Sequence, residues 1–261
     1  MRDFATRSAV SRTSVSRDAL DVFRLPVSLI DLGLTCFWDF RTGKTGVNSP
    51  VVKDLRNKND VGFRGTSSLS SVYTNGVYGA DLERSLNDYF SSKAMSYGSG
   101  FTELTIAMAF KIETAGGLNR HMISHWDALT NQRGFLLRLD ASDQVTLGLS
   151  NNGTSQSFYT SAETITDTAD WHTVIATYDT TNRGQIYLDG VAMTVTLASG
   201  SHISSIFSGG IPTLIGGVGP SSPGNYWDGM IGITELFIGS ALTAQEAASI
   251  HAQIMTLGEY V

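Results

Sequence analysis

Residues 170–191 read DWHTVIATYDTTNRGQIYLDGV, and this stretch indicates the fold class. Apolar and polar residues alternate through its first half, and strand side chains alternate between two faces. Val174 and Ala176 therefore belong to one face, and Ile175 belongs to the other. A polar turn follows at residues 179–184, and Asp189-Gly190 is a second reversal of the kind that tolerates positive φ. The stretch is predicted to be a β-hairpin.

Short alternating runs of the same kind recur through most of the chain, separated by turns rich in Gly and Asn. So many short strands with such turns predict an all-β protein, a two-sheet antiparallel sandwich. The expected strands are residues 61–65, 77–82, 87–92, 103–113, 120–126, 134–140, 143–150, 156–160, 171–179, 184–189, 191–197, 212–216 and 230–238.

One helix is predicted, at the C-terminal end. Thr243 and Glu246 have the spacing of a capping box, in which each side chain bonds the other residue's backbone amide. Apolar residues then recur every three or four positions, which predicts a stripe that packs on the sandwich. The stripe consists of Ala247, Ile250, Ile254 and Leu257.

Two motifs of the hairpin resemble the signature of the laminin-G-like, or concanavalin A-like, jelly-roll domains. Residues 171–174 (WHTV) are similar to the family's Trp-His-x-Val, and residues 187–190 (YLDG) to its Tyr-x-Asp-Gly. Four further segments follow in the family's order, so that the resemblance covers residues 34–261. They are residues 87–90, 101–112, 227–232 and 241–246. The resemblance implies a jelly-roll fold. Gly232 stands where the family often has Asp, so its acidic ligands are not carried over.

The chain is predicted to have two parts, an N-terminal docking arm with a lead-in (residues 1–33) and the jelly-roll domain (residues 34–261). Residues 39–61 are expected to be a loop, with Phe37 and Phe40 as core anchors at the start of the domain. The arm is polar, and we expect it to be held by a partner protein; the alternative is that it folds back on its own domain. Its arginines are Arg2, Arg7, Arg12, Arg17 and Arg24.

Composition excludes several classes of function. The formal net charge of −6 argues against nucleic-acid binding, which needs a basic face. No run of about 18 apolar residues is present, so no membrane span is expected. Cys36 is the single cysteine, which leaves no intramolecular disulfide and no thiolate zinc cluster, and its apolar neighbours predict a buried thiol.

The first 24 residues lack the apolar stretch of a signal peptide, so export is not expected. Because laminin-G-like modules mostly work outside cells, this combination favours a virion protein, assembled in the host cytoplasm and released with the particle. We therefore expect a bacteriophage virion protein whose residues 1–25 bind other virion proteins. Such appendages are commonly oligomeric, so a homo-oligomer is expected, although no heptad repeat supports it.

Catalytic groups are not found. A glycoside hydrolase of this fold needs a pair of carboxylates, and the candidates are Asp81 and Glu83, after which no third acid follows on that face. His121 and His125 are spaced for a metal site on a helix, but in a strand they lie about 13 Å apart. We expect neither an enzyme nor a zinc site.

Two kinds of binding site remain open. Calcium is the one cofactor considered, with Asn87, Asp88, Asp127 and Asn131 as candidate ligands; the alternative is that these residues form turns. Glycan binding needs an exposed aromatic platform beside amides, for which the candidates are Asn225, Tyr226 and Trp227; the alternative places Trp227 in the core.

The sequence therefore predicts a non-enzymatic virion protein, either a structural or decoration component or a tail adhesin, whose sandwich contacts cell-surface glycans. The alternatives are a carbohydrate-binding module of a bacterial protein and a divergent glycan hydrolase.

Overall fold

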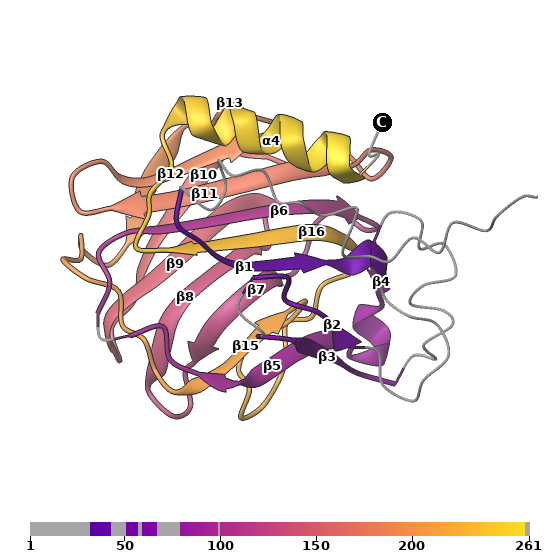
Figure 1. Ribbon diagram of the computed structural model, residues 1–261, viewed down its shortest axis with the longest axis horizontal. Helices are drawn as coiled ribbons and strands as arrows, with labels where there is room; N and C mark the ends of the chain where they lie inside the picture. Colours follow the sequence, from indigo (N-terminus) through magenta and orange to yellow (C-terminus); the bar gives the residue numbers. More distant parts are fainter. Residues whose placement is uncertain (1–31, 43–50, 57–58, 67–78, 99, 259–261) are drawn as a thin grey trace, which may run out of the picture.

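The computed structural model describes residues 32–42, 51–56, 59–66, 79–98 and 100–258. The expected arm at residues 1–25, with its five arginines, lies outside this part of the chain. Within it, two antiparallel sheets face one another and one long helix lies on the outside (Figure 1). The predicted all-β sandwich with a C-terminal helix is confirmed.

The first sheet has seven strands among the described residues. Its order is β1 (Leu34–Asp39), β16 (Gly229–Ile238), β6 (Leu104–Ile112), β11 (His172–Asp179), β12 (Arg183–Leu188) and β13 (Val191–Ala192), and β4 (Ala80–Leu82) also pairs with β16. The predicted hairpin is the β11–β12 pair, in which Val174 is opposite Leu188 and Asp179 is opposite Arg183.

The second sheet has nine strands in the same part of the chain. Its order is β14 (Val195–Ser199), β10 (Ser157–Thr164), β9 (Gln144–Gly153), β8 (Gln132–Leu139), β7 (Arg120–Asp127), β15 (Ile211–Ile215), β5 (Tyr89–Met95), β3 (Val61–Arg64) and β2 (Val51–Val52). Short 3₁₀ turns occupy Phe40–Thr42 and Arg84–Leu86.

Three expected boundaries were wrong. Residues 191–197 were predicted as one strand, but the chain forms β13 at the edge of the first sheet and β14 at the edge of the second. Residues 34–39, which were not among the expected strands, form β1, and β2 interrupts the expected loop at residues 39–61. Alternation alone does not reveal which strand a short run pairs with. The positions of β1, β2, β13 and β14 therefore became clear only from the strand order of the folded sheets.

Two apolar layers follow from the alternation. Val174, Ala176 and Tyr178 of β11 enter the core between the sheets, whereas Ile175 enters a second core beneath the helix. Cys36 and Phe40 are fully buried in the first core and Phe37 in the second, which confirms the predicted anchors and the buried thiol.

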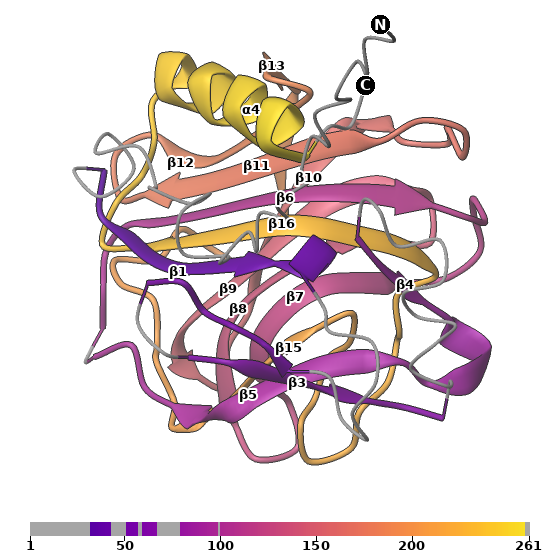
Figure 2. The same cartoon turned by 45° about the vertical axis from the view of Figure 1, so that its right-hand side comes forward.

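The helix α4 (Ala244–Gly258) covers the outer face of the first sheet. Its predicted capping box is present: the Thr243 amide donates to Glu246 Oε2 (2.8 Å), and the Glu246 amide donates to Thr243 Oγ1 (3.3 Å). Ala247, Ile250 and Ile254 are buried in the second core. Figures 1 and 2 show α4 beside β11 and β12, at the opposite end of the molecule from β3 and β5. The outer face of the second sheet has no such cover among the described elements.

Candidate glycan-binding groove

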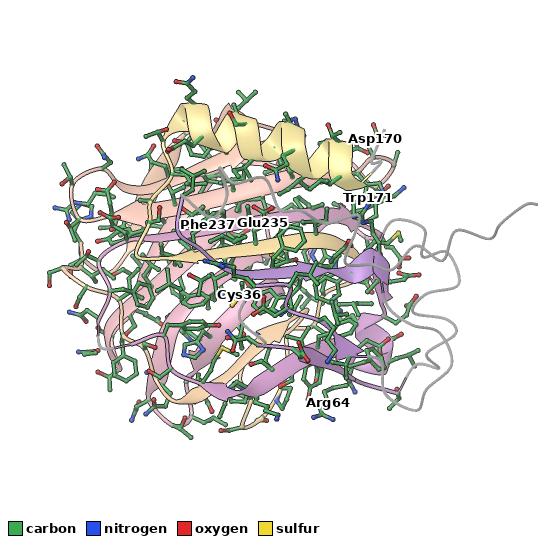
Figure 3. All side chains as sticks on the ribbon, in the orientation of Figure 1. Cys36, Arg64, Asp170, Trp171, Glu235 and Phe237 are labelled. Carbon is green, nitrogen blue, oxygen red and sulfur yellow. The ribbon has the colours of Figure 1, made fainter. Side chains whose placement is uncertain are left out.

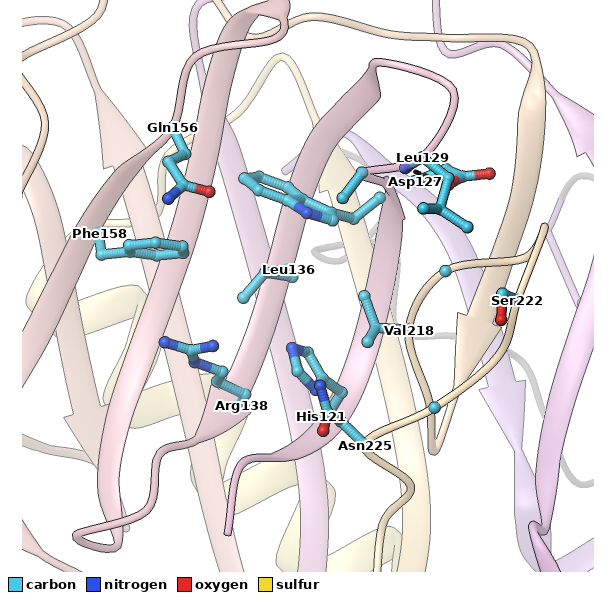
Figure 4. A pocket seen from close by; sticks show the side chains of 14 residues that line it. His121, Asp127, Leu129, Leu136, Arg138, Gln156, Phe158, Val218, Ser222 and Asn225 are labelled. Atoms are coloured by element: carbon cyan, nitrogen blue, oxygen red, sulfur yellow. Dashed lines mark hydrogen bonds between the residues drawn. The ribbon is translucent and has the colours of Figure 1, made fainter.

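A groove of about 370 Å³ lies on the outer face of the second sheet, over β7, β8 and β10 (Figure 4). Alternation produces this face, because Phe135 and Leu137 of β8 enter the core between the sheets while Leu136 and Arg138 point the other way. The loop from residue 218 to residue 225 forms one wall.

The floor of the groove is apolar and aromatic. Phe158 of β10 lies flat there because its neighbour in β9 is Gly148: a Cβ at that position would stand 2.6 Å from the Phe158 ring. The Trp126 ring lies 6.1 Å from the Phe158 ring at a tilt of 32°. Flat apolar rings of this kind provide a surface on which the apolar face of a sugar can stack.

Two nitrogen-bearing side chains stand at one end of this floor. Arg138 and His121 are direct neighbours across the β8–β7 pair. The Arg138 guanidinium carbon lies 4.9 Å from the centre of the Phe158 ring, a cation–π contact. Burial and the charge of Arg138 lower the pKa of His121 to about 3, so its ring is neutral at ordinary pH.

The opposite end holds Asp127, as Figure 4 shows. Its carboxylate accepts hydrogen bonds from the Leu129 amide (3.0 Å) and from the Ser221 hydroxyl. Burial raises the pKa of Asp127, but the hydrogen bonds from Ser221, Thr130 and Leu129 outweigh it and leave the pKa below its ordinary value. The groove is therefore polarised, with a satisfied carboxylate at one end and nitrogen donors at the other.

The three expected glycan-binding residues separate in the structure. Asn225 lines the groove, and its carbonyl accepts the backbone amide of His121 (3.0 Å). Tyr226 is tilted against Tyr89 at 5.8 Å and donates its hydroxyl to the Pro223 carbonyl (2.8 Å).

Trp227 corrects the expectation, because it is fully buried and cannot be an exposed platform. Its ring meets Phe110 edge-on at 5.7 Å in the core. The aromatic rings that line the groove are Trp126 and Phe158, neither of which was among the expected residues. The signal that could have found Phe158 is an aromatic residue on the outward positions of an alternating strand.

The four expected calcium ligands lie in two separate places. Asn87 and Asp88 precede β5, whereas Asp127 ends β7. Both strands pair with β15, and these pairings place Asp88 near one end of β15 and Asp127 near its other end. A separation of six residues along a strand corresponds to about 20 Å. Asn87 and Asn131 have φ of 57°, the left-handed conformation typical of turns. The four residues therefore do not form one site.

A different set of acids gathers at the edge of the first sheet. One carboxylate oxygen each from Asp81, Glu83 and Glu113 lie within 4.8 Å of one another. Burial raises the pKa of all three, and neighbouring carboxylates, including that of Asp228, raise them further. Calcium takes oxygen ligands of this kind. No third acid was expected beside Asp81 and Glu83, because Glu113 is distant from them in the chain and follows a different strand, β6.

The cluster and the groove lie on opposite sides of the molecule. Ala80 and Leu82 of β4 enter the core between the sheets, so Asp81 faces outward from the first sheet. The groove is on the outward face of the second sheet. The acids therefore do not line the groove.

The polar residues of the hairpin signature hold the fold. His172 Nδ1 lies 2.8 Å from Asp189 Oδ2, and the Thr173 amide donates to Asp189 Oδ1 (2.8 Å). The hydrogen bond with the Asp189 side chain raises the pKa of His172. Burial acts in the opposite direction but is the smaller effect. His121 and His125 both lie in β7, which confirms the strand expected there.

Residues 85–248 match the family described as the concanavalin A-like lectin/glucanases superfamily. Because this match covers more than half of the chain, the protein belongs to that superfamily. The fold is that of a lectin-type domain, consistent with the resemblance first suggested by the hairpin.

Solved structures are similar in fold at low sequence identity. The receptor binding domain of botulinum neurotoxin mosaic serotype C/D is 12% identical with a TM-score of 0.57, over 86% of this chain and 51% of that chain. The botulinum neurotoxin serotype G binding domain is 14% identical with a TM-score of 0.52, over 84% and 50%.

A Trypanosoma rangeli sialidase is 14% identical with a TM-score of 0.54, over 87% of this chain and 34% of the sialidase. This chain thus spans about half of the toxin domains and a third of the sialidase. None of the curated proteins matches it. In the part of the chain that the structure describes, no helix is long and apolar enough to cross a membrane.

Proposed function

We propose that this protein is a non-enzymatic carbohydrate-binding protein and that the groove over β7, β8 and β10 is its binding site. The observation that supports this most directly is the aromatic floor formed by the partly exposed Phe158, with the edge of the 5% exposed Trp126 beside it, next to polar side chains. Stacking on aromatic rings, combined with a few directed hydrogen bonds, is how such sites hold small polar ligands.

A glycan array with the full chain tests this proposal. Wild-type protein should bind a defined set of glycans, and Phe158→Ala should remove that binding while the unfolding midpoint stays within a few degrees. Val191→Ala is the control, since Val191 is 70% exposed on the first sheet, away from the groove. A glycan profile that survives Phe158→Ala unchanged would mean that the groove is not the site.

The enzymatic alternative has a separate test. It would use the carboxylates of Asp81, Glu83 and Glu113, which are close enough for acid–base chemistry. Turnover of any polysaccharide that disappears in Glu113→Gln would overturn the non-enzymatic proposal. We expect no turnover.

A second proposal concerns the setting and is supported by the sequence of residues 1–25 alone. The segment is polar and carries arginines at about five-residue spacing before the domain begins. We propose that it docks the domain, as a homo-oligomer, onto other proteins of a virus particle, where the groove meets cell-surface glycans. Deleting residues 1–25 should abolish incorporation into particles and leave the unfolding midpoint unchanged; normal incorporation would refute the docking role.

A further inference from the structure

Arg138 is a cation in the groove on which the charge of Asp140 acts only from beyond ion-pair distance. In the described part of the chain it makes no ion pair within 4 Å, and its Nε is buried without a hydrogen-bond partner. A buried polar group without a partner costs free energy, and the cost is larger for a charged group. The Phe158 ring holds the guanidinium in place but accepts no conventional hydrogen bond from it.

His121 adds a second unsatisfied group beside it. The residue is 2% exposed, lines the groove, and has an Nδ1 atom that is buried without a partner. In Figure 4 its ring stands next to Arg138, and both lie at the end of the groove away from Asp127. A neutral imidazole supplies one N–H donor at this place.

From this pair of groups we infer that the Arg138 end of the groove binds the anionic substituent of an acidic sugar, a carboxylate or a sulfate ester. The guanidinium provides charge and several donors, and the adjacent imidazole provides one more. Asp127 lies at the other end of the groove, where the Leu129 amide and the Ser221 hydroxyl hold its carboxylate, so distance weakens its repulsion of an anion at this end. The inference rests on the proposed function and specifies its ligand class.

Pairs of glycans that differ only in charge test the inference by isothermal titration calorimetry. The pairs are sialyllactose with lactose, oligogalacturonate with its methyl ester, and sulfated with unsulfated dextran oligosaccharide. In at least one pair the charged member should bind wild-type protein at least tenfold more tightly. The first two pairs report a carboxylate and the third reports a sulfate.

Three variants locate the effect. Arg138→Gln should bring the charged and neutral members to equal affinity, and Arg138→Lys should keep part of the preference. Arg64→Gln removes an exposed arginine from β3 and should keep all of it, which excludes a general effect of net charge. Unfolding curves of each variant verify that the domain is folded.

The outcomes separate the two proposals. Equal binding of the charged and neutral members, or a preference that survives Arg138→Gln, overturns the acidic-sugar inference and leaves glycan binding intact. If no glycan binds wild-type protein on the array, the proposed function fails, and this inference fails with it.

Discussion

Replacing Glu235 with glutamine should remove a large pH dependence from the stability of this protein. Glu235 is fully buried on β16, and neither of its carboxylate oxygens has a hydrogen-bond partner. Its cross-strand neighbours are Phe37 and Ala107, which belong, with Phe237, to the apolar core beneath α4 (Figure 3). A carboxylate in such surroundings is poorly solvated, so burial raises the pKa of Glu235 to about 8.

The size of the effect follows from the two pKa values. The ordinary pKa is 4.5, the folded value is about 8, and each pH unit between them is worth about 1.4 kcal/mol. Below pH 4.5 the carboxyl is protonated in both states, and its contribution to stability is fully present. Between pH 4.5 and 8 only the unfolded chain loses the proton, so the free energy of unfolding falls as the pH rises. The total loss is about 5 kcal/mol.

Urea unfolding of wild-type protein and Glu235→Gln at pH 5.5, 6.5 and 7.5 measures this loss. The difference between the two proteins should change by about 2.7 kcal/mol across the range, in favour of the variant at the higher pH. Glu103→Gln, at a partly exposed position, is the matched control and should follow the wild type. Parallel curves for wild type and Glu235→Gln would show that Glu235 is not a buried, protonated carboxyl.

Three further predictions concern single contacts. Asp143→Asn should lower the free energy of unfolding by about 3–5 kcal/mol, because it leaves the buried Arg120 without its ion pair; a loss below 1 kcal/mol in urea would contradict this. Native Cys36 should resist a thiol reagent at pH 8 until the protein unfolds, since burial raises the pKa of its thiol to about 12; rapid labelling of folded protein would count against it. Asp189→Asn should destabilise the protein more at pH 5.5 than at pH 8.5. The Asp189 hydrogen bond raises the pKa of His172, so the stability from this pair is full below the ordinary value of 6.5 and is lost at higher pH; equal losses at both values would refute it.

Much of the fold was predictable because it depends on local pattern. The alternation in residues 170–191 predicted the β11–β12 hairpin, and the Thr243–Glu246 capping box predicted where α4 begins. Both signals come from residues that are close together in the chain. Period-two alternation also separated the faces of β11 correctly, since Val174 and Ile175 enter different cores.

The candidate site was not predictable in the same way, because it is assembled from strands that are distant in the chain. Phe158 and Arg138 meet over the groove only because β8, β9 and β10 are neighbours and Gly148 leaves room between them. Trp227 was a reasonable platform by its loop sequence, but the loop directs its ring into the core.

The sequence by itself thus determined the class of fold, since hydrophobic periodicity and turn residues act locally. Only the tertiary structure decided which face of the second sheet stays open, that Glu113 lies beside Asp81 and Glu83, and that Glu235 is shielded from water. The physical reason is that solvation and charge pairing depend on neighbours in space, and strand order sets those neighbours.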